Sequence, residues 1–169
     1  MKQEHDSIKR THRLVLLSLF ASLTVVTTLL FRFPIPYAQG YLNGGDGIVM
    51  LAALVLGPSA GFWVGSIGSM LADLIAGYAM YMPFTFIIKG IEGLIVGWLF
   101  LKFKKAHVPV FLAGSWMAVG YILADWILYS LAAAIAAFPM NLLQGAVGAV
   151  IALLLFKVIQ PIFASKFHL

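Results

Sequence analysis

The chain has 169 residues, of which 62% are hydrophobic and only 10% are charged, and it carries a formal net charge of +5. Because an ordinary soluble domain contains about 25% charged residues, this composition excludes that class and indicates a protein that lies in a lipid bilayer. The chain has no cysteine, which excludes disulfides, thiolate metal sites and cysteine nucleophiles. We expect no metal ion and no cofactor.

Six apolar segments follow one another along the chain, and a helix that spans a membrane needs about 20 such residues. We therefore predict an all-α integral membrane protein, with residues 1–169 forming a single domain, a compact bundle of six transmembrane helices. The predicted helices cover residues 14–31, 44–56, 58–77, 84–101, 110–137 and 139–158. The first segment is too long for the apolar region of a signal peptide, and no small-residue cleavage site follows it, so we expect it to remain as a helix.

The second predicted helix is short. Residues 44–56 rise about 20 Å at roughly 1.5 Å per residue, whereas the hydrocarbon core is about 30 Å thick. The preceding segment, FRFPIPYAQGYLNGGDG, is therefore expected to dip into the membrane, where non-helical backbone is tolerated only when it is buried in protein or lines a cavity. It is either an outer loop with Asn43 or Asp46 as a helix cap, or a lid formed by residues 37–46 over a pocket, and one segment can serve both purposes.

Small residues recur at helical spacing in the third and fourth predicted helices. The stripes comprise Gly61, Gly65, Gly68 and Ala72 in one helix and Gly90, Gly93 and Gly97 in the other. Such stripes allow helix backbones to approach closely. We predict that they serve packing inside the bundle, and a face that slides against a partner or substrate is the alternative.

The positive charges indicate how the chain is oriented. Of the eleven lysines and arginines, all except Arg32 and Lys89 lie before the first helix, between the fourth and fifth helices, or at or beyond the end of the last one. Positive residues concentrate on the cytoplasmic side of membrane proteins, so we predict a multi-pass protein of the cell membrane with both termini in the cytoplasm. The positive charge thus indicates the topology of the chain. The sequence contains no basic stripe with interleaved aromatic residues, so no nucleic-acid partner is predicted.

With this orientation, nearly all polar side chains of the spanning segments fall in the outer half of the membrane. If Asp73, Lys89, Glu92 and Asp125 lay at the midplane, their insertion would cost on the order of 10 kcal/mol. They must therefore pair, face water, or both. Lys89 and Glu92, three positions apart on one helix face, can pair locally, and Asp73 on the adjacent helix is a second candidate partner for Lys89.

Two interpretations of these charges remain open. One is a buried ion-pair network that locks the third and fourth helices together, and the other is a pocket for a small polar molecule. Three acids to one base leave acidic capacity uncompensated, which favours the pocket. The predicted substrate-binding residues are Tyr41, Asn43, Asp46, Asp73, Lys89, Glu92, Asp125, Asn141 and Gln144. Lys89 either contacts the ligand or only neutralises a neighbouring acid.

Aromatic residues near the helix ends offer stacking surface for such a ligand, or they form the interfacial belt. They are Trp63, Tyr78, Tyr81, Trp126 and Tyr129. No catalytic residue is predicted, because the chain contains no HExxH, GxSxG or P-loop motif. All four histidines lie in the termini or in the predicted cytoplasmic loop. A proton-coupled secondary transporter that works through Asp73, Glu92 or Asp125 is the main alternative function, and a membrane enzyme is a lesser one.

The segment GGDGIVMLAALVLGPSAGFWVGSIGSMLADLIAGY, followed by PFTFIIKGIEGLIVG, resembles the substrate-binding S components of energy-coupling factor (ECF) vitamin transporters. It looks most like the group assigned to hydroxymethylpyrimidine or pyridoxine-type compounds. The resemblance implies a six-helix bundle that captures a vitamin from outside and partners with a membrane scaffold, the T component, and two cytoplasmic ATPases. It also implies that the loop before residue 46 acts as a gate, and that Ser18, Ala21 and Ser22 contact the scaffold.

The residue types constrain the substrate further. An acid-rich pocket with one lysine disfavours a polyanion, since like charges repel strongly in a low dielectric. A neutral or weakly basic heteroaromatic ring with hydroxymethyl groups fits better, because carboxylates accept hydrogen bonds from ring N–H, amine and hydroxyl groups. We therefore expect pyridoxine or hydroxymethylpyrimidine as the substrate. The resemblance implies that the chain captures it as a non-catalytic subunit of an ATP-driven importer.

Overall fold

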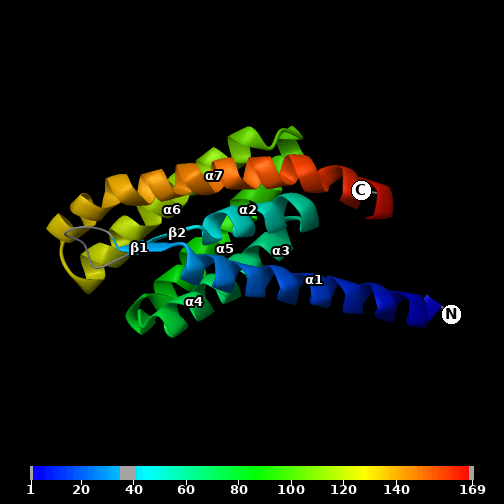
Figure 1. The fold of residues 1–169 in the computed structure, drawn as a ribbon, viewed down its shortest axis with the longest axis horizontal. Coiled ribbons are helices and arrows are strands. Elements are labelled where there is room, and N and C mark those ends of the chain that lie inside the picture. Colours follow the sequence, from blue (N-terminus) through cyan, green and yellow to red (C-terminus); the bar gives the residue numbers. More distant parts are fainter. Residues whose placement is uncertain (1, 35–40, 168–169) are drawn as a thin grey trace.

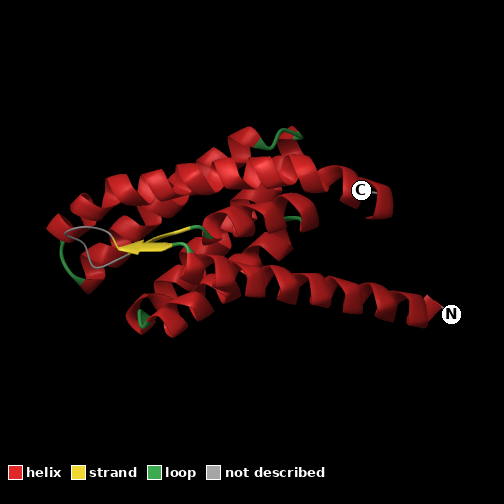
Figure 2. Ribbon diagram, viewed as in Figure 1, coloured by secondary structure: helices red, strands yellow, loops and turns green. Residues whose placement is uncertain are grey.

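The computed structural model describes residues 2–34 and 41–167 and shows a bundle of helices with one short hairpin (Figures 1 and 2). The helices are α1 (Lys2–Leu30), α2 (Gly45–Leu56), α3 (Pro58–Trp63), α4 (Ser69–Ala76), α5 (Met82–Phe103), α6 (His107–Leu128) and α7 (Leu131–Phe167). A π-helical turn, Val64–Gly68, joins α3 to α4, and a 3-10 turn, Ala79–Tyr81, precedes α5. Five helical stretches have the length and apolar composition to span a membrane. The predicted count of six crossings and the cytoplasmic location of the termini stay predictions.

Helix α2 lies at the centre of the bundle. Every residue from Gly45 to Val55 is buried, and α2 contacts α1, α3, α5 and α7. Its 12 residues rise only about 18 Å, which agrees with the short second helix expected from the sequence. Because the chain before α2 reaches inward to meet it, residues from that chain are brought next to the polar side chains of the other helices.

A β-hairpin stands where the sequence predicted an irregular loop. Strand β1 (Arg32–Pro34) pairs antiparallel with β2 (Tyr41–Asn43), with Arg32 opposite Asn43. Strand β2 also contacts α7 and α1. In Figure 1 the hairpin lies at the opposite end of the molecule from the N- and C-terminal ends of α1 and α7. Of the predicted lid, residues 37–40 lie outside the described residues, whereas residues 41–46 form β2 and the start of α2.

The glycine stripes pack inside the bundle, as predicted, and Gly61 and Gly93 bring the two stripes into contact with each other. A Cβ atom on Gly93 would lie 2.2 Å from the carbonyl oxygen of Gly61, and a Cβ on Gly65 would lie 2.2 Å from that of Lys89. The backbones of α5 and of the helix that contains α3 are therefore in direct contact. The π-helical turn at Val64–Gly68 lies at this contact, and π-turns of this kind occur frequently at functional sites.

The predicted boundaries of the last two helices are wrong. Helix α6 ends at Leu128 rather than at residue 137, and α7 begins at Leu131 and continues through Pro139. The helical conformation is interrupted at Tyr129 and Ser130. The Ser130 hydroxyl accepts a hydrogen bond from the Ala133 N–H and so caps the N-terminus of α7. Hydropathy does not mark this break because apolar residues flank it on both sides, and membrane helices tolerate an internal proline when neighbours satisfy the freed backbone groups.

This correction moves three polar residues along their helices. Asp125 lies in the last turn of α6 rather than near the middle of a long helix. Asn141 and Gln144 lie well inside α7 rather than in its first turns. All three still lie in the half of the bundle that contains the hairpin, and they line the same space as Tyr41 and Asn43 of β2.

Candidate functional site

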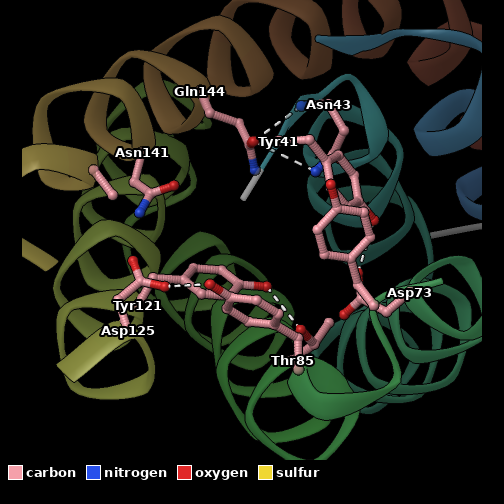
Figure 3. Close-up of a pocket in the computed structure, with 11 residues that line it drawn as sticks. Tyr41, Asn43, Asp73, Thr85, Tyr121, Asp125, Asn141 and Gln144 are labelled. Carbon is pink, nitrogen blue, oxygen red and sulfur yellow. Dashed lines mark hydrogen bonds between the residues drawn. The ribbon is translucent and has the colours of Figure 1, made fainter. Parts of the chain in front are cut away.

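A pocket lies where β2, the α4–α5 connection, α6 and α7 meet (Figure 3). The described residues that line it are Tyr41, Asn43, Asp73, Tyr78, Tyr81, Thr85, Tyr121, Asp125, Ala137, Asn141 and Gln144. About 440 Å³ inside it is free of atoms when the open mouth is included, and the centre of a water molecule can occupy about 40 Å³ of that space. The pocket is therefore polar and narrow.

Two carboxylates stand on different walls of the pocket, and each is paired with a tyrosine rather than with a cation. The Tyr41 hydroxyl donates to Oδ1 of Asp73 at 2.7 Å, and the Tyr81 hydroxyl donates to Oδ1 of Asp125 at 2.6 Å. Oδ2 of Asp73 is buried and has no hydrogen-bond partner among the described residues. A buried oxygen without a partner carries a desolvation cost that a hydrogen-bond donor would remove.

Tyrosine rings line one side of the pocket in a continuous series. The ring centroids of Tyr41 and Tyr78 are 4.9 Å apart, those of Tyr78 and Tyr81 are 6.3 Å apart, and those of Tyr81 and Tyr121 are also 6.3 Å apart. Burial, followed by the neighbouring Asp73 carboxylate, raises the pKa of the Tyr41 phenol. Tyr41 therefore stays protonated and remains a donor to Asp73.

Two amides on α7 complete the wall. Gln144 accepts a hydrogen bond from the Asn43 backbone N–H at 2.9 Å and donates one to Oδ2 of Asp46 at 3.0 Å. Asn141, one turn earlier, lines the same space and makes no side-chain hydrogen bond within residues 41–167 (Figure 3). The Asn141 amide thus keeps both donor and acceptor capacity for a guest molecule.

A second polar group, which we call the ion cluster, consists of Asp46, Lys89 and Glu92. Lys89 Nζ forms an ion pair with Asp46 Oδ1 and another with Glu92 Oε2, the latter at 3.1 Å. These side chains are 1%, 2% and 0% exposed, respectively, and none of them lines the pocket. The Tyr121 ring, which does line it, has its centroid 5.8 Å from Lys89 Nζ. Asp73, the other partner proposed for Lys89, pairs with Tyr41 instead.

The structure thus divides the nine predicted residues into two sets. Six of them line the pocket, namely Tyr41, Asn43, Asp73, Asp125, Asn141 and Gln144, and the other three form the ion cluster. Sequence reasoning missed Thr85 and Tyr121, whose hydroxyls lie 3.0 Å apart. A signal for both was present, because each lies four positions before a predicted residue and hence on the same helix face.

The other predicted candidates lie away from the pocket or at its edge. Tyr78 and Tyr81 line the pocket. Trp63, Trp126 and Tyr129 do not line it, and the side chains of the two tryptophans are about half exposed. On α1, Ser18 and Ser22 are exposed and Ala21 is partly buried, because the Ala21 carbonyl lies against Gly68. The scaffold-contact role of these three residues stays a prediction.

A second cavity lies at the other end of the bundle, between the α2–α3 turn and the last turns of α5 and α7. Its lining is mostly apolar, with Leu54, Leu56, Phe100 and Phe156 among its residues and Lys104 and Gln160 at its polar positions. Binding sites for small polar ligands need convergent polar groups. The pocket beneath the hairpin has them and this cavity has few, so the pocket is the candidate site.

A bundle of apolar helices that encloses a polar pocket is the architecture of a membrane-embedded substrate-binding protein. Residues 8–161 match the model of the family described as "ECF-type riboflavin transporter, S component". The chain therefore belongs to the family of ECF-type S components. It is a multi-pass membrane protein and the substrate-binding subunit of a vitamin-type transporter, in a family that is generally non-catalytic.

The chain is also similar to two curated proteins and to one solved structure. The chain is 32% identical over 155 residues to the thiamine precursor transporter HmpT of Lactococcus lactis, covering 91% of this chain and 89% of that one. It is 43% identical over 130 residues to an uncharacterised protein of Pyrococcus woesei, covering 75% of this chain and 86% of that one. Its fold matches a solved S component of a bacterial ECF transporter with a TM-score of 0.77 at 22% identity, covering 90% of this chain and 98% of that one.

Proposed function

We propose that the chain captures a small heteroaromatic vitamin precursor of the hydroxymethylpyrimidine or pyridoxine type and delivers it to an ATP-driven ECF importer. The observation that carries this proposal is the unpartnered Oδ2 of Asp73, which is buried at a pocket wall. An exocyclic amine, a ring N–H or a hydroxyl on the ligand would supply the missing donor. Asn141 and Asp125 would complete recognition from α7 and α6.

The charge of the pocket supports a neutral or weakly basic ligand. Asp73 and Asp125 belong to it, and no lysine or arginine is among the described residues that line it. Lys89, whose Nζ lies 5.8 Å from the centroid of the Tyr121 ring, is paired with Asp46 and Glu92. A phosphorylated vitamin would bring like charge into a low dielectric without a counter-ion, so we expect the pocket to reject it.

The size of the pocket supports a single ring. The space open to the centre of a water molecule is about 40 Å³, and tyrosine faces border it at stacking separations. The family model is described by riboflavin, whose three fused rings and sugar alcohol need more room, whereas HmpT is described as a thiamine precursor transporter. The narrow pocket favours the precursor.

The partners follow from the family. ECF-type S components imply a T component and two ATPases, and the exposed Ser18 and Ser22 on α1 give a face of small side chains for the scaffold. ATP hydrolysis would then belong to the partner subunits. The acidic side chains leave a proton-coupled secondary transporter as a second candidate, which would transport substrate without these partners.

A ligand panel tests the proposal. The chain, purified in detergent without added ligand, is titrated with hydroxymethylpyrimidine, pyridoxine, thiamine, riboflavin and pyridoxal phosphate, and native mass spectrometry identifies anything that co-purifies. We expect hydroxymethylpyrimidine or pyridoxine to bind at nanomolar to micromolar concentration without ATP. Tighter binding of riboflavin or of the phosphate ester would overturn the substrate assignment. Uptake driven by a pH gradient into liposomes that contain this chain alone would favour the secondary transporter, and recovery of a chemically altered ligand would favour an enzyme.

A further inference from the structure

The side chain of Gln144 joins the ion cluster to the hairpin. Its Nε2 donates to Oδ2 of Asp46 at 3.0 Å, and its Oε1 accepts from the Asn43 backbone N–H at 2.9 Å and from Asn43 Nδ2 at 3.4 Å. Both ends of one amide are therefore occupied by protein groups. A residue that lines the pocket is in this way bonded on one side to a buried carboxylate and on the other to β2.

The chemistry of the two neighbours leaves the amide only one direction. A backbone N–H can only donate and a carboxylate can only accept, so Oε1 must face Asn43 and Nε2 must face Asp46. If the amide were turned over, two donors would meet at Asn43 and two acceptors would meet at Asp46. The direction of the Gln144 amide is therefore set by Asp46.

Asp46 is itself held firmly. Its Oδ1 pairs with Lys89 while its Oδ2 accepts from Gln144, so each oxygen has its own partner. The backbone confines it as well, since a Cβ atom on Gly148 would lie 2.6 Å from the Cβ of Asp46. Helices α2 and α7 are thus in contact one turn beyond Gln144, and the carboxylate has little freedom to move.

The other end of the amide fixes β2. Asn43 is the last residue of the strand, and Tyr41, two positions earlier, projects from the same face of it. Tyr41 donates to Asp73, and Asn43 is bonded to Gln144. Strand β2 is therefore attached by side-chain hydrogen bonds to α4 through Tyr41 and to α7 through Asn43, and the Thr28 hydroxyl of α1 donates to Asn43 Oδ1 at 3.4 Å. Of these bonds, only the one to α7 involves a partner of the ion cluster.

We propose that Asp46 is a positioning residue of the pocket, which sets the direction of the Gln144 amide and through it holds β2 and Tyr41 in place. This inference rests on the proposed function in that the pocket is taken to hold the substrate. It assigns Asp46, Lys89 and Glu92 to support of the site rather than to contact with the ligand. Gln144 then makes its hydrogen bonds to protein groups, and Asn141, Asp73 and Asp125 are the residues that bind the ligand.

Asp46→Asn tests the direction of the amide. The Lys89 ammonium can only donate hydrogen bonds, so it remains bonded to the side-chain oxygen of the new amide at position 46. The NH₂ group of that amide then faces Gln144. Gln144 must then turn over, which places its own NH₂ against the Asn43 N–H and breaks that bond. Asp46→Asn with Gln144→Glu restores it, because a carboxylate at 144 accepts from both neighbours and the total charge is unchanged.

Two measurements follow each variant. Hydrogen exchange of the Asn43 amide in the ligand-free protein reports the bond itself, and the dissociation rate of the bound precursor reports its consequence. We expect both to rise about tenfold in Asp46→Asn and to return to near wild type in the double variant. Gln144→Leu, which keeps the Asp46–Lys89 pair, should accelerate exchange of the Asn43 amide as much as Asp46→Asn does. Thr24→Val, which removes a buried hydrogen bond within α1, should leave both rates unchanged.

The outcomes separate this inference from the proposed function. An unchanged exchange rate of the Asn43 amide in Asp46→Asn and Gln144→Leu would overturn the positioning role of Asp46. An exchange rate that stays as high in the double variant as in Asp46→Asn would also overturn it, because Asp46 would then act only through general stability. If the exchange pattern holds but no precursor binds, the positioning role stands and the proposed substrate fails.

Discussion

The two polar groups inside this bundle lie side by side and yet differ in what satisfies them. In the ion cluster, a lysine pairs with two carboxylates, and the three side chains are at most 2% exposed. Neither oxygen of Glu92 has a hydrogen-bond partner among the described residues, although Oε2 lies in the ion pair with Lys89. In the pocket, each carboxylate accepts from a tyrosine, and free space separates the walls. Charge that is neutralised by charge supports the structure, whereas charge that is paired with neutral donors around a cavity keeps capacity for a ligand. Both groups are buried and acidic, and only their partners distinguish them.

The ring of Tyr121 separates the two groups. Its hydroxyl lies 3.0 Å from that of Thr85 at the pocket wall, while Lys89 Nζ lies 5.8 Å from the ring centroid. A cation so placed interacts favourably with the ring face. The aromatic wall therefore stabilises the buried lysine and also keeps it out of the pocket, which leaves the pocket acidic.

Lys89→Met is the strongest test of the difference. Removal of the lysine leaves Asp46 and Glu92 as buried carboxylates without a counter-ion, which should destabilise the protein by about 3–5 kcal/mol. Thermal unfolding in detergent measures this loss. Lys102→Met is the matched control, because Lys102 is exposed and its ammonium lies over the Trp98 and Phe103 rings, and it should change stability little. A Lys89→Met protein as stable as wild type would show that the cluster is not structural.

Asp73→Asn tests the pocket. The substitution keeps the shape of the side chain but removes the charge that the ligand donor meets, and hydrogen bonds to charged groups contribute about 1.5–3 kcal/mol. We expect affinity for the precursor to fall about 100-fold, measured by titration calorimetry, while the unfolding temperature stays the same or rises. Normal affinity in this variant would remove Asp73 from the site.

Asp125→Asn should have a smaller effect on affinity. Asp125 also stands at the pocket wall, but of the two pocket carboxylates only Asp73 has a fully buried oxygen without a hydrogen-bond partner among the described residues. The ligand therefore gains less there, and we expect a loss of about tenfold. If Asp125→Asn weakened binding more than Asp73→Asn did, the ligand would be anchored on α6 and the assigned order of the two carboxylates would be reversed.

Tyr41→Phe is the mildest change. It keeps the ring that faces Tyr78 and removes the hydroxyl that donates to Asp73, so the dissociation rate should rise about fivefold. Stopped-flow displacement of bound ligand measures this rate. Tyr129→Phe serves as its control, because the Tyr129 hydroxyl contacts Met80 outside the pocket. Equal effects of the two substitutions would contradict a specific role for Tyr41.

Much of the fold could be read from hydropathy and from the glycines. The short second helix and the packed glycine stripes were both predicted, because a segment too short for the bilayer and a row of small residues each have a direct geometric consequence. The end of α6 could not be read, since apolar residues continue across Tyr129 and Ser130. The hairpin was also missed, because its strands have only three residues each.

The nine residues of the candidate site could be predicted as one set, but the sequence could not divide them into residues that line the pocket and residues that form the ion cluster. Asp46, Asp73, Lys89 and Asp125 are all polar residues in apolar surroundings, and their sequence spacing gives only the local pair of Lys89 with Glu92. Whether Lys89 would also meet Asp73 or Asp46 depended on which helix faces lie together. Tyr121 and Thr85 were overlooked because aromatic and hydroxyl residues are unremarkable in a membrane helix, although their four-residue spacing from Asp125 and Lys89 placed them on the same faces.

The sequence by itself determined that this chain lies in a membrane, that polar side chains gather in one half of its bundle, and that α2 is short. Those properties follow from the cost of placing each residue type in hydrocarbon, which depends on the residue and not on its neighbours. Only the tertiary structure decided that Lys89 turns to Asp46 and away from Asp73, and that Gln144 reaches β2. Pairings of this kind join residues from different helices, and their energies exist only once the backbones have been brought into contact.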